Sequence, residues 1–118
     1  MKIVRIHADD AGETAIEPIR PEWVARRANA HEALLVARPR IVLRSWDAQE
    51  LDLHNAPERR LLVMLDGSLE IESSRGHRVT LGPGDVLLAE DVDGRGHRAR
   101  WSGERGARML MVLLDEPK

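Results

Sequence analysis

Short runs in which apolar and polar residues alternate dominate the chain from residue 39 onward. Runs of roughly four to eight such residues are typical of half-buried β-strands, because successive side chains of a strand point to opposite faces of a sheet. Asp66-Gly67 separates two of the runs, and Asp-Gly is a strong signal for a tight β-hairpin because both residues tolerate positive φ. The pattern predicts strands over residues 40–46, 51–54, 60–65, 68–72, 78–81, 86–89, 97–101 and 108–114.

The N-terminal part of the chain, residues 1–38, follows a different pattern. Residues 1–6 alternate apolar and basic side chains and predict one short strand. Between Pro21 and Leu35 the composition suits a helix, since proline is favoured in a first helical turn and alanines and arginines follow. The apolar spacing there is weak, so a partly ordered arm is the alternative. We therefore divide the chain into an N-terminal strand and arm over residues 1–38, packed on the rest of the molecule or on a dimer partner, and a β-domain over residues 39–118.

Many short strands without a convincing helix after Leu35 predict an all-β sandwich or closed barrel. The length of 118 residues supports one core and is too short for two. The chain contains no Cys, which excludes disulfides and thiolate metal sites and favours a reducing cytoplasm. It also contains no Phe or Tyr, so any aromatic stacking on a ligand must come from Trp23, Trp46 or Trp101.

The charge balance argues against polyanionic partners. The chain has 18 basic and 20 acidic residues, a formal net charge of −2, and its arginine clusters are interleaved with acids. Nucleic-acid binding usually requires a basic face, so we expect no nucleic-acid partner. No stretch approaches the roughly 20 apolar residues of a membrane span, and the N-terminus lacks an apolar signal-peptide region. We expect a soluble, cytoplasmic protein that does not engage membranes.

Two segments carry the candidate chemistry. Residues 54–67 run from His-Asn-Ala-Pro through an apolar strand into Asp-Gly, and residues 81–97 run from Leu-Gly-Pro-Gly-Asp-Val to Gly-Arg-Gly-His. In order and separation they resemble the two motifs of the cupin superfamily, in particular a group of short, uncharacterised cupin-domain proteins with His-x-Ala-Pro and Gly-Pro-Gly-Asp-Val segments. The resemblance implies an all-β cupin-type jelly-roll barrel with an irregular or partly helical N-terminal arm. It also implies a homodimer, often formed by exchange of the N-terminal segment.

The metal ligands of the cupin pattern are only half present. Aligned on Gly67, the resemblance places His54 at the first histidine and His97 at the histidine of the second motif. Ala56 stands at the second histidine and Arg60 at the glutamate. Two histidines do not hold a divalent ion tightly. A guanidinium beside them stays charged and repels the ion.

Asp52 offers two ways to complete this site. Strand alternation puts Asp52 on the inner face with His54 and Arg60 unless a bulge intervenes. In one interpretation Asp52, His54 and His97 form a two-His, one-carboxylate triad for iron, manganese or zinc, and the protein is a metal-dependent oxygenase or isomerase. In the other, which we prefer, Asp52 pairs with Arg60 and the metal site is degenerate.

The preferred interpretation makes Arg60 the positive centre of the barrel. Such a site suits a small organic ligand that carries a carboxylate, enolate or phosphate group. Trp46, Met64 or Trp101 would supply the apolar wall of the pocket.

Two other classes of function stay open. In a metal-independent isomerase, cyclase or lyase, His54 or His97 acts as general base and Arg60 stabilises developing negative charge. The second class is an accessory barrel that binds a protein partner. Whether the protein is an enzyme is left undecided by the sequence.

Other residues have an ordinary structural interpretation. We expect Glu90 and Asp91 to be surface carboxylates in the loop that enters the second motif. Met109 and Met111 are expected in the core because Met fills irregular gaps. Strand parity alone does not say whether Met109, Met111 and Leu113 or their neighbours face inward.

Overall fold

The structure, a computed structural model, describes residues 2–27, 30–32 and 40–114, and gives side chains for all of these except residues 24–27 and 30–32. The described residues fold into strands and contain no helix. The strands are β1 (Ile3–Ala8), β2 (Thr14–Pro18), β3 (Val24–Arg27), β4 (Ala30–Glu32), β5 (Arg40–Trp46), β6 (Gln49–His54), β7 (Arg60–Asp66), β8 (Ser68–Ser73), β9 (Arg78–Leu81), β10 (Val86–Glu90), β11 (His97–Ser102) and β12 (Ala107–Leu113). Across these described ranges no helix is long and apolar enough to cross a membrane.

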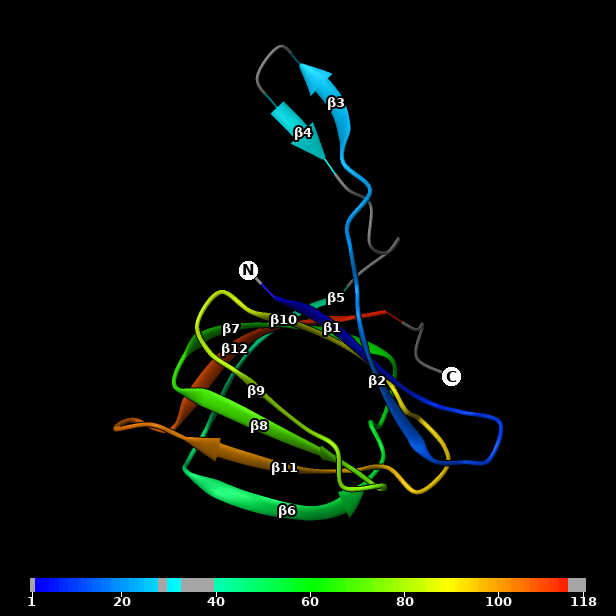
Figure 1. Ribbon diagram of the computed structural model, residues 1–118. Coiled ribbons are helices and arrows are strands. Elements are labelled where there is room, and N and C mark those ends of the chain that lie inside the picture. Colours follow the sequence, from blue (N-terminus) through cyan, green and yellow to red (C-terminus); the bar gives the residue numbers. More distant parts are fainter. Residues whose placement is uncertain (1, 28–29, 33–39, 115–118) are drawn as a thin grey trace.

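Two sheets face each other and enclose the core (Figure 1). The six-stranded sheet has the order β2-β1-β10-β7-β12-β5, and the four-stranded sheet has the order β6-β11-β8-β9. Strands pair antiparallel in both sheets except β1 and β10, which run parallel. From β5 onward the chain changes sheet at every connection except β8–β9. This is the predicted all-β jelly-roll arrangement.

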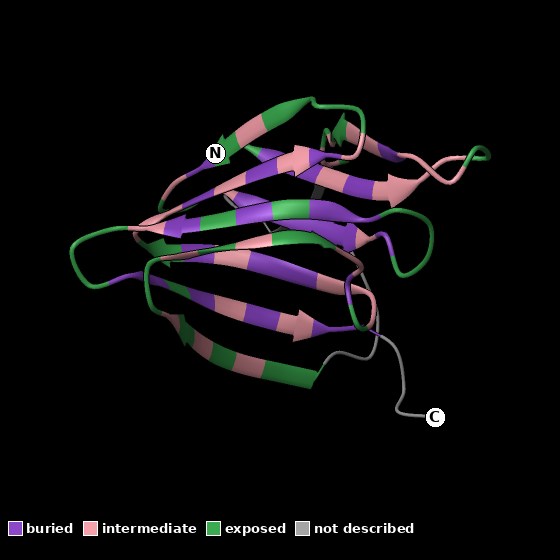
Figure 2. Ribbon diagram, turned by 90° about the horizontal axis from the view of Figure 1, so that it is seen from below, coloured by how far each residue is buried: buried purple, intermediate pink, exposed green. Residues whose placement is uncertain are grey.

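The inner faces of the two sheets form an apolar core. Burial alternates along the strands, as Figure 2 shows, because the pleat turns every second side chain inward. On β12 the inward residues are Met109, Met111 and Leu113, which settles the parity that the sequence left open. The buried inner residues are Val4, Ile6, Ala56, Leu62, Met64, Leu69, Ile71, Leu81, Leu87, Ala89, Ala99, Trp101, Ala107, Met109, Met111 and Leu113.

The N-terminal strands belong to the barrel itself. β1 lies between β2 and β10 in the six-stranded sheet, and Val4 and Ile6 are part of the core. The strand predicted over residues 1–6 is therefore present, whereas β2 was not predicted. Beyond β2 the chain crosses the outer face of this sheet, where Ile19 packs against a second apolar cluster. That cluster consists of Ile3, Leu61, Val86, Leu88 and Leu114, with Val63 and Val112 beside it.

The described residues of the arm do not form the helix considered for residues 21–35, of which residues 28–29 and 33–35 lie outside the described residues. In the described part of that span β3 and β4 form a hairpin whose strands pair only with each other. The hairpin stands away from the two sheets (Figure 1), and Trp23 at its base is 58% exposed. A helix here would have lacked an apolar stripe to bury, and tertiary packing of such a stripe supplies most helical stability.

The Asp66-Gly67 turn joins strands in different sheets. The sequence predicted a hairpin here, but β7 lies in the six-stranded sheet and β8 in the four-stranded sheet. The hairpin prediction is therefore wrong, although the turn itself is present. Gly67 has φ of 75°, and a Cβ at this position would lie 2.3 Å from the carbonyl oxygen of Gly106. Two backbone segments meet at this corner, and the close approach requires glycine.

Candidate functional site

The two histidines singled out from the sequence lie side by side. His54 ends β6 and His97 begins β11, and the two residues are directly paired across the four-stranded sheet. Their ring centroids are 4.5 Å apart with an interplanar angle of 55°. His97 is buried and His54 is half-buried, which places the pair at one end of the barrel interior.

Gly96 allows this close pairing. Its φ is +79°, and a Cβ at this position would lie 2.1 Å from the carbonyl oxygen of His54. Any larger residue would therefore push the start of β11 away from the end of β6. Thr14 holds the same peptide from the other side, because its hydroxyl donates a hydrogen bond to the carbonyl oxygen of Gly96.

Asp91 lies beside this pair, at a position that the sequence did not predict. We expected a surface carboxylate, but Asp91 is fully buried, and its Oδ2 accepts a hydrogen bond from Nδ1 of His97. Its other carboxylate oxygen, Oδ1, has no hydrogen-bond partner among the described residues. The alternation of side chains along the strand could have predicted this inward position, because Leu87 and Ala89 face inward on β10 and Asp91 continues the alternation.

The loop that carries Asp91 is attached to the segment after His54. The side-chain amide of Asn55 donates to three carbonyl oxygens of the loop, those of Asp91, Asp93 and Gly94, at 3.2, 2.9 and 3.2 Å. The backbone N–H of Ala56 donates to the Asp91 carbonyl as well, at 3.2 Å. These bonds hold the two sequence segments together.

Both histidines are held with the proton on the same ring nitrogen. Nδ1 of His54 lies 2.8 Å from the carbonyl oxygen of Asp52, and Nδ1 of His97 bonds the carboxylate of Asp91. Because carbonyl and carboxylate oxygens only accept, Nδ1 must donate in each ring. In the neutral rings the lone pair is then on Nε2. An imidazole held through Nδ1 by an acceptor oxygen in this way is typical of histidines that act as bases or ligands.

Asp52 does not share the inner face with His54. Between the pairs His97–His54 and Ala99–Leu51, β6 has one residue more than β11, which is a β-bulge. The bulge reverses the parity, so Asp52 points outward and bonds Nε of Arg98 at 2.9 Å. The expectation that Asp52 would lie beside the histidines, or pair with Arg60, is therefore wrong.

Arg60 does lie on the inner face. It alternates with the core residues Leu62 and Met64 and pairs with Ala89 and Leu113, which are also inward. The side chain is half-buried, and its Nε donates to the carbonyl oxygen of Glu58 at 3.2 Å.

The charge of Arg60 is poorly compensated. Its pKa is lowered by burial and by the positive charge of Arg44, while Glu58 and Asp91 act in the opposite direction. Glu58 forms an ion pair with Arg40 at 2.7 Å. Within the described residues no carboxylate lies in ion-pair contact with Arg60. The positive charge at this end of the barrel is thus open to an external anion.

The predicted wall residues lie inside the barrel, toward its other end. Trp46 and Trp101 come from opposite sheets and stack with centroids 4.7 Å apart. Cζ of Arg44 lies 5.5 Å from the centroid of Trp46. Trp101 follows His97 by four positions on β11, which corresponds to roughly 13 Å along the strand. Met64 is only 1% exposed and packs in the core.

The described donor set does not fit a tight divalent metal. Among the residues that the structure describes, no three His, Asp or Glu side chains gather closely enough to hold an ion. Two imidazoles remain from the expected triad of Asp52, His54 and His97, since Asp52 points outward. Arg60 adds a positive charge from the inner face of the opposite sheet. These described residues therefore do not fit a tightly bound divalent metal.

Comparison with known proteins defines the fold. No family model and no curated protein matches the sequence. Among solved structures, a protein of unknown function from Rhizobium leguminosarum bv. viciae is 24% identical, with a TM-score of 0.54 over 66% of this chain and 71% of that one. A putative ethanolamine utilization protein Q from Salmonella typhimurium is 12% identical, with a TM-score of 0.51 over 97% of this chain and 95% of that one. A cupin superfamily protein from Desulfitobacterium hafniense is 22% identical, with a TM-score of 0.49 over 79% and 84% of the two chains.

The chain has a cupin fold. The all-β barrel that the resemblance implied is thus the fold of this chain. At these identities the likeness concerns the fold alone, and the chemistry must be argued from the residues of this barrel.

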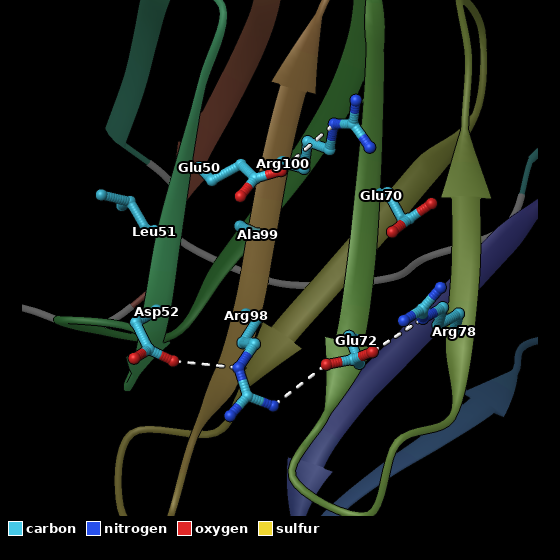
Figure 3. A pocket seen from close by; sticks show the side chains of 9 residues that line it. All are labelled: Glu50, Leu51, Asp52, Glu70, Glu72, Arg78, Arg98, Ala99 and Arg100. Atoms are coloured by element: carbon cyan, nitrogen blue, oxygen red, sulfur yellow. Dashed lines mark hydrogen bonds and ion pairs between the residues drawn. The ribbon is translucent and has the colours of Figure 1, made fainter.

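A separate hollow of about 560 Å³ lies on the outer surface of the cupin barrel, over the four-stranded sheet (Figure 3). Its arginines are ion-paired: Arg98 contacts Asp52 and Glu72, and Arg78 contacts Glu72. Arg100 pairs with Glu50 on the neighbouring strand in the same way. Because these charges compensate each other and face away from the histidines, we do not assign the site to this hollow.

Proposed function

We propose that this cupin barrel binds a small organic anion at the end where Arg60, His54 and His97 meet. The observation that carries the proposal is the inward, half-buried guanidinium of Arg60, which has no ion-pair partner within the described residues. A bound carboxylate, enolate or phosphate group would supply the missing negative charge. The two Nε2 atoms offer further polar contacts beside it.

The test is ligand-dependent stabilisation across a panel of small organic acids. A ligand at about a hundred times its Kd raises the free energy of unfolding by roughly 2.7 kcal/mol, which for this chain length corresponds to a Tm increase of roughly 10 °C. Arg60→Gln should abolish the increase. Arg108→Gln is the matched control, because Arg108 is exposed on β12. An increase that survives Arg60→Gln would refute the site.

A second candidate function, a metal-independent isomerase, cyclase or lyase, is favoured by the Asp91–His97 pair. The buried carboxylate holds the imidazole with its lone pair on Nε2, as required of a general base. Arg60 would stabilise the negative charge that forms when a proton leaves the carbon next to a bound carboxylate. The test is deuterium exchange at that carbon in heavy water, followed by NMR. We expect exchange with the native protein and none with His97→Gln, whereas equal exchange by both would exclude His97 as the base.

We also propose that the protein forms a homodimer through β5. In the described part of the chain β5 is an edge strand of the six-stranded sheet. The backbone N–H and C=O groups on its outer edge can therefore pair with another strand. Ile41 and Leu43 on its outer face are 66% and 70% exposed. Antiparallel pairing of two β5 strands about a two-fold axis would join the sheets and cover these side chains.

A further inference from the structure

Each histidine of the candidate site presents an unbonded ring nitrogen to open space. Nδ1 of His54 and Nδ1 of His97 are hydrogen-bonded, whereas neither Nε2 atom has a partner among the described residues. In this part of the chain the fully enclosed side-chain atoms without a partner are Oδ1 of Asp91 and Nε1 of Trp101. Because the two Nε2 atoms are not enclosed, each borders space that a water molecule or a ligand atom can enter.

The terminal nitrogens of Arg60 are open in the same way, since only its Nε is bonded within the described residues, to the carbonyl oxygen of Glu58. Asp91 connects this guanidinium to the histidine pair. It lies two residues after Ala89, the register partner of Arg60, and faces the same interior. Such diagonal neighbours lie roughly 7 to 8 Å apart, within reach of a long side chain. The carboxylate of Asp91 binds Nδ1 of His97, and its charge also acts on Arg60.

The guanidinium and the imidazoles require different atoms of a ligand. A guanidinium only donates hydrogen bonds and pairs with a carboxylate. A neutral imidazole with its proton on Nδ1 only accepts at Nε2, so it requires a donor, which a carboxylate does not provide. The ring centroids of His54 and His97 are 4.5 Å apart, so neighbouring donors on one small molecule can serve both rings. A carboxylate without further polar groups would satisfy Arg60 and leave both Nε2 atoms unpaired.

The local charge favours a hydroxyl group over an ammonium group as this donor. Burial and the positive charge of Arg44 already lower the pKa of Arg60. Arg44 shares the inner face of β5 with Val42 and Trp46 by strand alternation. Asp91 is bonded through Oδ2 to the neighbouring imidazole, and its Oδ1 is enclosed. A ligand ammonium group would add a further positive charge, and Asp91 offers it no free oxygen.

We propose that the ligand of this barrel is a small hydroxycarboxylic acid, whose carboxylate binds Arg60 and whose hydroxyl groups donate to Nε2 of His54 and His97. This inference rests on the proposed binding of an organic anion at Arg60 and adds the chemical class of that anion. The histidine pair then distinguishes a hydroxy acid from the unsubstituted acid of the same carbon number.

The experiment is calorimetric titration of the native protein with four three-carbon acids, propanoate, lactate, glycerate and alanine, at about pH 8, where free imidazole is neutral. We expect lactate or glycerate to bind about three- to tenfold more tightly than propanoate, which is the ratio that one net hydrogen bond gives. Alanine carries an ammonium group in place of the lactate hydroxyl and should bind less tightly than lactate. In NMR spectra, glycerate should shift the ¹⁵N resonances of the Nε2 atoms more than propanoate does.

Substitution of the histidines tests the contact directly. Asparagine places its amide near the position of Nδ1 and has no atom at the position of Nε2. His54→Asn and His97→Asn should therefore each lower the ratio of hydroxy-acid affinity to propanoate affinity. His54→Asn keeps the test decisive if His97→Asn disturbs the buried contact with Asp91, because His54 is only half-buried. His77→Asn is the matched control, since His77 is exposed in the turn after β8, and should leave the ratio unchanged.

The outcomes separate this inference from the proposed function. If Arg60→Gln weakens binding but the native protein binds propanoate as tightly as lactate and glycerate, the hydroxy-acid assignment is wrong and the anion site stands. Alanine binding as tight as that of lactate, or a hydroxy-acid preference that survives both histidine substitutions, also overturns the assignment. The assignment is wrong as well if none of the four acids binds. If no acid of the wider panel stabilises the native protein either, both proposals fail.

Discussion

The carboxylate of Asp91 accepts a hydrogen bond from Nδ1 of His97 where both side chains are buried. A buried carboxylate normally accepts hydrogen bonds on both of its oxygens. Oδ1 of Asp91, however, has no partner in the described part of the chain. Such an unsatisfied buried oxygen costs stability, on the order of 1 to 3 kcal/mol. Its presence beside an oriented imidazole supports the proposal that this end of the barrel is a functional site.

Replacing Asp91 should therefore change both stability and the state of His97. We expect Asp91→Asn to lower the free energy of unfolding by about 1.5 to 3 kcal/mol in urea denaturation, because the hydrogen bond loses its charge assistance. Asp93→Asn, in the same loop but exposed, should stay within about 0.5 kcal/mol of the native protein. The ¹⁵N chemical shifts of His97 report the tautomer. Unchanged shifts together with unchanged stability would show that the Asp91 carboxylate does not hold the ring.

Gly96→Ala should separate the two histidines. The added Cβ would lie 2.1 Å from the His54 carbonyl oxygen and also requires a φ of +79°. Gly76→Ala is the matched control, because Gly76 has a φ of +87° but open space around it. The control should lose about 1 to 2 kcal/mol, the usual cost of a left-handed conformation, and Gly96→Ala at least about twice as much. Equal losses in urea denaturation would mean that the close approach at Gly96 is not required.

Glu90 should contribute to the acid sensitivity of the protein. Burial acts to raise the pKa of its carboxyl, but hydrogen bonds from Arg5 and Arg59 outweigh burial and hold the pKa below its usual value. The charged form is thus favoured in the folded state. This contribution is fully present above the unfolded pKa and disappears as the pH falls through the lower folded pKa.

Glu90→Gln removes this contribution. We expect the Tm of the Glu90→Gln variant to be lower than that of the native protein at about pH 7. The difference in Tm should shrink as the pH is lowered below about 4. Glu104→Gln, an exposed side chain in the β11–β12 connection, should show no such pH-dependent difference. A constant Tm difference across the whole pH range would mean that the arginine contacts do not stabilise the charged form.

Metal binding should be weak. Two imidazoles near a guanidinium fall short of the three or four ligands of a tight zinc or iron site. We expect elemental analysis of protein purified without chelators to find well under one iron, manganese or zinc per subunit, and dialysis against a chelator to leave Tm unchanged. Near-stoichiometric metal would show that a further carboxylate completes the site.

Leu43→Glu should produce a monomer if β5 forms the dimer interface. The substitution places a charge on the exposed outer face of the edge strand, where burial against a second copy would desolvate it. Sedimentation of the native protein should give a dimer and that of Leu43→Glu a monomer, whose circular dichroism should still be that of the folded native protein. Leu53→Glu, on the edge strand of the other sheet, is the control and should stay dimeric.

The sequence by itself determined the strands and the fold class. Alternating runs after residue 39, separated by glycine-rich turns, predicted strands that correspond to β5–β12. These signals are local, because pleat parity and turn conformation depend on neighbouring residues. The cupin resemblance of residues 54–67 and 81–97 likewise placed His54, Arg60 and His97 in segments that meet, and the structure shows the two histidines paired.

Only the tertiary structure decided what lies beside those residues. The bulge at Asp52 adds one residue to β6 relative to β11, and the pairing that reveals it comes from a segment more than forty positions away. It turned Asp52 outward, while a fully buried Asp91 took the place beside His97. The inward position of Arg44 similarly depended on which face of β5 meets the core. Parity says which side chains share a face, but only the packing of the two sheets says which face is inside.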